Sequence, residues 1–245
     1  MNTTMETIIL LVGQFCSSLF LWIGIALLAE RATISALQKR FIQIFGALLF
    51  LVWFAATPLL AQSGFFRGVG IPLALVLTLL FGFVLMFSQT FRQLLTITPM
   101  HWIIGIQVFR VLGGMWLIGY AQGQLPGLFA LPAGIGDTLT GLTAPLVAYW
   151  FSKNGKGARL IAFIWCLFGT LDLLDAITLA NLTNPALIAV LPFVLIPAFG
   201  VPRSFVLHGY TFWLLGKRRT EDASTAPAGP APCPAARVWL PHVDG

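Results

Sequence analysis

Uninterrupted runs of apolar residues, each about twenty positions long, constrain this chain more than any other feature. Residues 71–88, which contain the run LALVLTLLFGFVL, carry no charged side chain. A bilayer core about 30 Å thick is crossed by about 20 helical residues, so such a run is long enough to span it. The run does not alternate between apolar and polar residues, as the strands of a membrane barrel do. The sequence therefore predicts an all-α membrane helix bundle.

The charge content excludes the other broad classes of protein. Only 9% of the 245 residues are charged and 58% are hydrophobic, whereas an ordinary soluble domain has about 25% charged residues. A water-soluble fold could not cover its surface with so few charges. Disordered chains are poor in apolar residues, which excludes that class too. The chain is predicted to be a polytopic membrane protein.

Seven windows are long and apolar enough to be transmembrane helices. They cover residues 7–29, 41–61, 71–88, 103–121, 132–151, 160–180 and 186–216. The last window is interrupted by Pro192, Pro197 and Pro202, and we expect one kinked helix there because two halves of about 14 residues would be too short to cross. Residues 1–219 are thus predicted to form the transmembrane domain. Residues 220–245, rich in Pro and Ala, are predicted to form a disordered cytoplasmic tail.

Lysine and arginine predict the orientation of these spans. Of the 14 basic residues, Arg67 lies in one set of loops, Arg110 and Arg203 lie within spans, and eleven lie in the opposite set of loops. These eleven are Arg31, Lys39, Arg40, Arg92, Lys153, Lys156, Arg159, Lys217, Arg218, Arg219 and Arg237. Since cytoplasmic loops are enriched in basic residues, the N-terminus is predicted outside and the C-terminus in the cytoplasm. The net charge of +6 is then topological, and we expect no nucleic-acid partner.

Several kinds of site are disfavoured by the sequence. The three cysteines form no CxxC pair, so we expect neither a disulfide framework nor a metal site, and the cysteines within spans are expected to pack. His101 and His208 lie near predicted span ends and are expected at the interface, which leaves a pair of haem ligands only as an alternative. No cofactor is predicted. Because HExxH, GxSxG and P-loop patterns are absent, an enzyme is the minority interpretation.

Four charged residues have no topological explanation: Arg110, Asp137, Asp172 and Asp175. A charge at the centre of a membrane helix costs at least about 2.5–3.5 kcal/mol, so these side chains should face the bundle interior and find partners. Helical rise places the three acids in the outer half of successive spans, with Arg110 just beneath them. Arg203, deeper in a long last span, is expected to reach the inner surface instead.

Neighbouring residues complete this candidate binding site. Gln107 shares a helix face with Arg110, and Gly134 and Gly136 stand beside Asp137, where small residues allow close helix approach. Because two carboxylates one turn apart will not both ionise readily in a low dielectric, we expect either a proton on Asp172 or Asp175, or a bound cation or ligand amine. An alternative is that the charges only lock the helices together.

Three segments carry a resemblance. They are LPGLFALPAGIGDTLTGLTAP at residues 125–145, QVFRVLGG at residues 107–114, and LPFVLIPAFGVP at residues 191–202 followed by His208. Together they resemble a family of small, uncharacterised bacterial integral membrane proteins, over roughly the last four spans. The resemblance implies a bacterial inner-membrane protein and carries no activity.

Three functions remain open. The first is binding or transport of a small solute, cation or proton, which suits proline- and glycine-broken helices around a polar site. Seven spans do not divide into equal repeats, so a homodimer could supply the symmetry. The second is a non-catalytic scaffold or accessory subunit of a membrane complex, and the third is an intramembrane enzyme.

Overall fold

The computed structural model describes residues 3–225, with side chains up to residue 217, and every regular element in that range is helical. The elements are α1 (Thr3–Arg31), α2 (Ala36–Gln62), η1 (Phe65–Arg67), α3 (Gly70–Leu85), α4 (Gln89–Ile97), α5 (Met100–Gly105), η2 (Ile106–Gly114), α6 (Met115–Ala121), α7 (Gly127–Ser152), α8 (Ala158–Leu182), α9 (Pro185–Ile188), η3 (Ile196–Gly200) and α10 (Val201–Thr225). The predicted all-α class is confirmed for the described residues.

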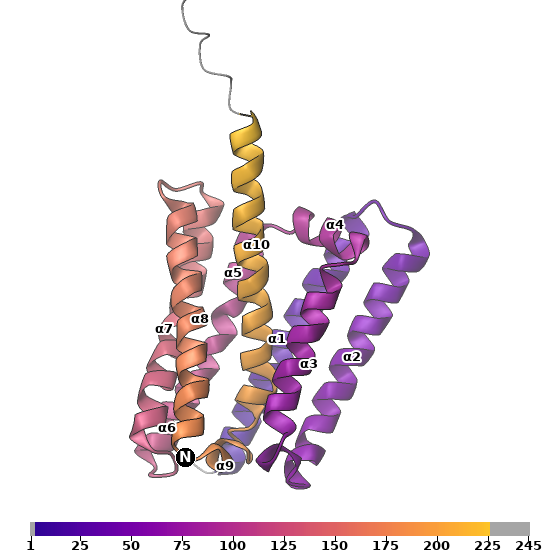
Figure 1. Cartoon of the computed structure of the whole chain (residues 1–245). Helices are drawn as coiled ribbons and strands as arrows, with labels where there is room; N and C mark the ends of the chain where they lie inside the picture. The colour runs from indigo at the N-terminus through magenta and orange to yellow at the C-terminus, as the bar shows by residue number, and fades with distance from the viewer. Residues whose placement is uncertain (1–2, 226–245) are drawn as a thin grey trace, which may run out of the picture.

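The long helices run side by side and alternate in direction (Figure 1). The α1–α2 turn, α4 and the α7–α8 turn lie at one end, whereas η1, the α6–α7 turn and α9 lie at the other. Arg31, Arg92 and Lys153 are therefore at the first end, and Arg67 is at the opposite end. Basic residues from distant parts of the sequence thus gather at one end of the bundle.

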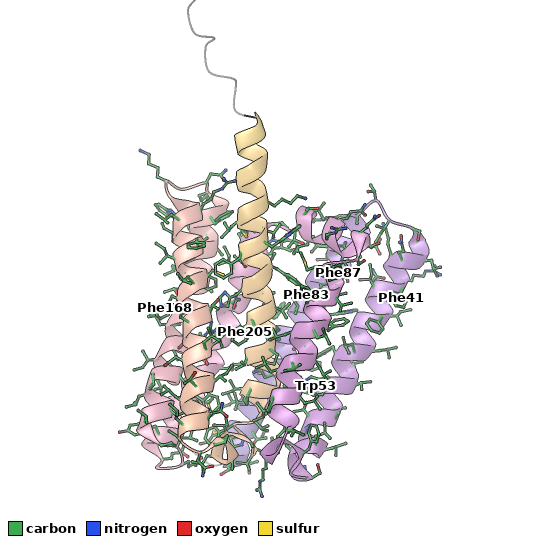
Figure 2. All side chains as sticks on the ribbon, viewed as in Figure 1. Phe41, Trp53, Phe83, Phe87, Phe168 and Phe205 are labelled. Carbon is green, nitrogen blue, oxygen red and sulfur yellow. The ribbon has the colours of Figure 1, made fainter. Side chains whose placement is uncertain are left out.

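The outer surface of the bundle is apolar. Figure 2 labels Phe41, Phe87 and Phe168 on this surface, and they are 63%, 70% and 43% exposed. Four helices are long and apolar enough to cross a membrane, namely α1, α2, the continuous Met100–Ala121 helix and α8, and a fifth crossing results if α3 and α4, bent by 90° at their junction, count as one. Exposed apolar surface on helices of this length identifies a membrane protein.

Two long helices fall outside that group because they carry the polar and small residues of the interior. Helix α7 contains GIGDTLTGLT, and α10 contains Arg203 and His208. Asp137, Thr140 and the adjacent glycines of α7 are buried. The low hydropathy of α7 therefore reflects what this helix buries, whereas in α10 the charged residues from Lys217 on also lower it.

The last predicted span begins later than expected. Residues 186–216 do not form one kinked helix, because α9 ends at Ile188 and a continuous helical path resumes only at Ile196. Pro202 has no N–H to donate to the Ala198 carbonyl, and the Trp53 indole on α2 donates to that oxygen at 3.2 Å. At its other end α10 continues to Thr225, and the rest of the predicted tail lies outside the described residues.

Candidate functional site

Arg110 projects into the bundle from η2, a stretch of 3-10 helix within a longer helix. With three residues per turn, side chains at i and i+3 align along the helix axis. Gln107, Arg110 and Gly113 have this spacing, and all three are buried. A 3-10 stretch in mid-helix often marks a hinge or a functional position. The winding therefore directs Gln107 and Arg110 to the same side, as the sequence predicted.

The Arg110 guanidinium is shared by two carboxylates from two other helices. Its Nε donates to Asp137 Oδ1 on α7 at 2.8 Å, and its Nη2 donates to Asp172 on α8. Nη1 donates to the backbone carbonyl of Gly169 at 3.0 Å. The side chains of Arg110, Asp137 and Asp172 are 1%, 8% and 8% exposed. The predicted meeting of these three residues is confirmed.

These residues lie close to the centre of their helices. Asp137 is ten residues after the first residue of α7, and Asp172 is ten residues before the end of α8. At 1.5 Å per residue both are about 15 Å from the same end of the bundle. Asp137 and Asp172 therefore lie at matched depth, as expected. Asp137 lies deeper than the sequence predicted, because α7 begins at Gly127 and not at residue 132.

His208 is the fourth member of the cluster, and the sequence interpretation missed it. It is 1% exposed, and its Nε2 lies 3.1 Å from Arg110 Nη1. Since a guanidinium can only donate, Nε2 must accept and the proton sits on Nδ1, so the imidazole is neutral. The expectation of an interfacial histidine is wrong. The sequence pattern that could have revealed the buried histidine is a polar stripe at i, i+4 and i+7 on α10. Ser204, His208 and Thr211 form this stripe, and all three are buried.

The Nδ1 side of His208 meets two further polar groups. Cys166 Sγ on α8 lies 3.1 Å from Nδ1 and 3.5 Å from the His208 carbonyl oxygen. The thiol can therefore donate a hydrogen bond to the carbonyl and accept one from the Nδ1–H group. The Gln107 amide nitrogen lies 3.3 Å from Nδ1, but both are donors in this tautomer, so the two do not form a hydrogen bond. Cys166 was expected only to pack, whereas it holds the histidine in place. We call Gln107, Arg110, Asp137, Cys166, Asp172 and His208 the Arg110 cluster.

Glycines make room for this cluster. A Cβ atom added at Gly113 would collide with the Asp137 side chain, and one at Gly136 with the Asp172 carboxylate. A Cβ at Gly169 would stand 2.7 Å from His208 Nε2 and 2.8 Å from Arg110 Nη1. Gly136 thus belongs to the site, as predicted. Gly134 instead accommodates Leu117, so it brings α7 close to α6.

Asp175 does not join the cluster. It is exposed on α8, one turn beyond Asp172, and within the described part of the chain no hydrogen bond or ion pair involves it. The structure therefore separates the two acids that the sequence treated as a pair. Asp175 offers a control position on the same helix.

Arg203 forms a second polar cluster with α1. Its Nη2 donates to Gln14 Oε1 and to Ser17 Oγ, both at 3.0 Å, and its Nη1 donates to Ser18 Oγ at 2.9 Å. The ring of Phe109 lies under the guanidinium, 3.7 Å from its carbon to the centroid. Arg203 was expected to reach the inner surface, and this is wrong. Within the described residues no carboxylate forms an ion pair with it.

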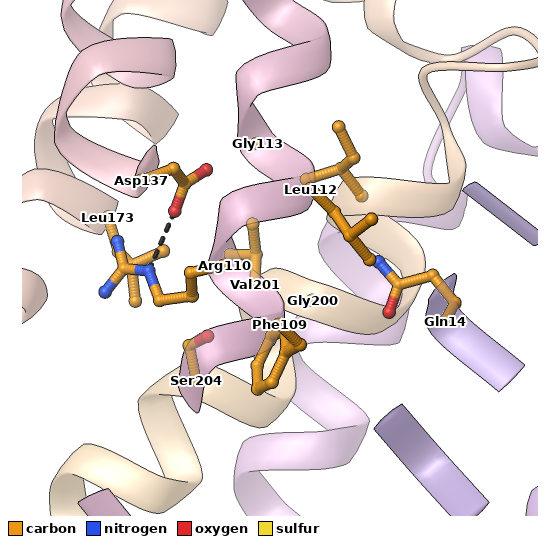
Figure 3. Close-up of a pocket in the computed structure, with 11 residues that line it drawn as sticks. Gln14, Phe109, Arg110, Leu112, Gly113, Asp137, Leu173, Gly200, Val201 and Ser204 are labelled. Atoms are coloured by element: carbon orange, nitrogen blue, oxygen red, sulfur yellow. Dashed lines mark hydrogen bonds and ion pairs between the residues drawn. The ribbon is translucent and has the colours of Figure 1, made fainter. Parts of the chain in front are cut away.

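A small cavity is lined by Arg110 and Asp137 of the Arg110 cluster and by Gln14, a hydrogen-bond partner of Arg203 (Figure 3). Its volume is about 10 Å³, and its polar lining comes from Gln14, Arg110, Asp137 and Ser204. That volume is close to the minimum for one water molecule. The site as it stands has no room for a larger solute.

Comparison with known proteins gives a match to a protein family. A family model described as a domain of unknown function, DUF8737, matches residues 68–216. The matched region contains the whole Arg110 cluster and Arg203, whereas α1 and α2 precede it. No curated protein and no solved structure matches the chain.

Proposed function

We propose that this chain, which belongs to the DUF8737 family, is a multi-pass inner-membrane protein of a bacterium that binds and releases a proton at its Arg110 cluster. Proton exchange there would gate or drive the passage of a small solute. The observation that carries the proposal is one buried guanidinium shared by the carboxylates of Asp137 and Asp172. Polar groups of this kind inside a membrane commonly mark ion or proton pathways.

Charge counting gives the reason for choosing a proton. Arg110 contributes +1, Asp137 and Asp172 contribute −2, and the neutral His208 contributes nothing, which leaves −1. One proton brings the cluster to zero. A metal ion would need ligands that converge on one point, and among the described residues no group of three or more His, Cys, Asp or Glu side chains is arranged to hold one. A cavity of about 10 Å³ also favours a proton over a solute in this conformation.

The protonation site has a direct spectroscopic test. Infrared difference spectra of the reconstituted chain between high and low pH should show the C=O band of one protonated carboxyl group. Asp137→Asn or Asp172→Asn should abolish that band, because each removes the excess carboxylate. Asp175→Asn, one turn away and exposed, should leave it unchanged. A band that survives both of the first two substitutions would exclude this site.

The structural alternative also has an observation in its favour. The Arg110 guanidinium bonds to three neighbouring helices, and glycines pack closely around it. An accessory subunit would need only that rigidity. If Asp172→Asn lowers the folded yield and the wild-type protein shows no pH response, the scaffold is the better explanation. Folded Asp172→Asn protein that has lost a wild-type pH response supports the proton site.

Seven crossings, with the N-terminus outside, are part of the proposal. Cysteines introduced at Gln124 and Asn154, in the turns at the two ends of α7, test it in a Cys16→Ser, Cys233→Ser background, in which the buried Cys166 is the one native cysteine left. A membrane-impermeant maleimide should label Gln124→Cys in intact cells, and Asn154→Cys only after the inner membrane is opened. The reverse pattern would invert the orientation, and labelling of both in intact cells would remove α7 as a span.

A further inference from the structure

Asp175 interrupts a mostly apolar stripe on the outer surface of α8. The stripe consists of exposed residues spaced three or four positions apart, namely Ile164, Phe168, Leu171, Asp175, Thr178 and Leu182. Residues at this spacing lie along one face of a helix. Phe168 marks this face on the outside of the bundle in Figure 2. We call these six residues the α8 stripe. Its apolar members suit contact with lipid, and Asp175 does not.

Helical rise places Asp175 inside the hydrocarbon layer. Helix α8 is long and apolar enough to cross a membrane. Its 25 residues span about 37 Å, so a centred α8 extends about 4 Å beyond each edge of a 30 Å core. Asp175 lies seven residues before Leu182, the last residue of α8, which places it about 7 Å below that edge. The short aspartate side chain cannot reach back to water as a lysine or arginine does.

The described part of the chain provides no cation for this carboxylate. None of its ion pairs involves Asp175. Asp172, one turn away, is itself an acid and is held by Arg110. The Thr178 hydroxyl donates to the Leu174 carbonyl of its own helix at 2.8 Å. Since charged side chains within a membrane almost always pair or face the bundle interior, Asp175 calls for a cation from outside the chain.

A second copy of this chain does not supply that cation. Arg110 and Arg203 lie within the bundle and bond to partners in their own chain. Arg67 is at the same end of the bundle as Leu182, but it lies between α2 and α3, on the side opposite α7 and α8 (Figure 1). A two-fold dimer formed through α8 brings the same surface of both copies together. Asp175 would then meet a second acidic stripe and no arginine.

We propose that the α8 stripe is the docking surface for a membrane helix of another protein, and that this helix carries a lysine or arginine at the depth of Asp175. Membrane helices associate through close packing and through polar contacts between them. The apolar residues of the stripe provide the packing, and Asp175 selects a partner of opposite charge. The proposal goes beyond proton exchange and does not depend on it, because Asp175 lies outside the Arg110 cluster.

Synthetic membrane helices test this proposal with the full chain in lipid vesicles. Each probe is a polyleucine helix of about 20 residues. The first carries one lysine about 10 Å from its end, the second carries glutamate at that position, and the third carries only leucine. Energy transfer between the labelled chain and a labelled probe measures the Kd. Wild type should bind the lysine probe at least tenfold more tightly than either of the others, and equal binding of all three overturns the proposal.

Variants of the stripe show whether Asp175 reads the lysine. Asp175→Asn should reduce the preference to less than twofold, whereas Asp175→Glu should keep it. Thr178→Val is the matched control, because Thr178 lies on the same stripe and bonds to its own helix; it should keep the tenfold preference. A preference that survives Asp175→Asn overturns the proposal. Efficient disulfide crosslinking between two copies of Thr178→Cys in the same vesicles also overturns it, since a second copy would then cover the stripe.

Discussion

Replacing Arg110 by glutamine is expected to destabilise the protein by about 3–5 kcal/mol, because breaking a buried ion pair leaves the opposite charge uncompensated. Here two carboxylates, Asp137 and Asp172, would be left without a cation, and the Gly169 carbonyl and His208 Nε2 would lose their donor. The free energy of unfolding in bicelles measures this effect. Arg67→Gln, at an exposed position in η1, should change it by less than about 0.5 kcal/mol.

A triple variant separates charge from packing. Arg110→Gln combined with Asp137→Asn and Asp172→Asn carries no formal charge in the cluster, so it should regain much of the stability that Arg110→Gln loses. Interactions of this kind are not additive, and the size of the recovery measures the coupling. If Arg110→Gln is as stable as wild type, the ion pairs make no net contribution to the fold. If the triple variant recovers nothing, lost packing is the cause.

The meeting of Arg110, Asp137 and Asp172 could be predicted from the sequence because charge is scarce in it. A lone arginine in an apolar helix must find a partner, and helical rise is regular enough to compare depths between helices. Both arguments use only the chain's own periodicity. The structure confirms both contacts of Arg110, with Asp137 and with Asp172.

Arg203 and His208 could not be placed in the same way, since their depth was counted from the wrong helix start. The final helical path begins at Ile196 and not at residue 186, and ten residues correspond to about 15 Å along a helix. That shift moves both side chains from the expected inner interface to the interior. No local pattern in the proline-rich segment fixes where the chain turns into its last helix.

Asp175 shows a second limit of sequence reasoning. Positions i and i+3 share a broad helix face, but α8 packs mainly against α7, α9 and α10. The face that it buries is therefore narrow enough to include Asp172 and exclude Asp175. Which neighbours a helix has is a tertiary property that its own sequence does not contain.

Gly169→Ala is the second substitution with a large expected effect. The added Cβ would stand 2.7 Å from His208 Nε2 and 2.8 Å from Arg110 Nη1, closer than van der Waals contact allows. Neither side chain can move away freely, since each is held by the other members of the cluster. Overpacking of this kind costs about 1–3 kcal/mol, and we expect the free energy of unfolding to fall by that amount.

Gly209→Ala is the matched control, because Gly209 lies in α10 next to His208 and a Cβ there meets nothing within 4 Å. In a helix with open space alanine is favoured over glycine by roughly 0.5–1 kcal/mol, so this variant should be as stable as wild type or more stable. The two variants add the same methyl group to neighbouring helices, and only one adds it against the cluster. Equal stability of the two would mean that the helices can separate around Arg110 at little cost, and the close packing of the site would then be refuted.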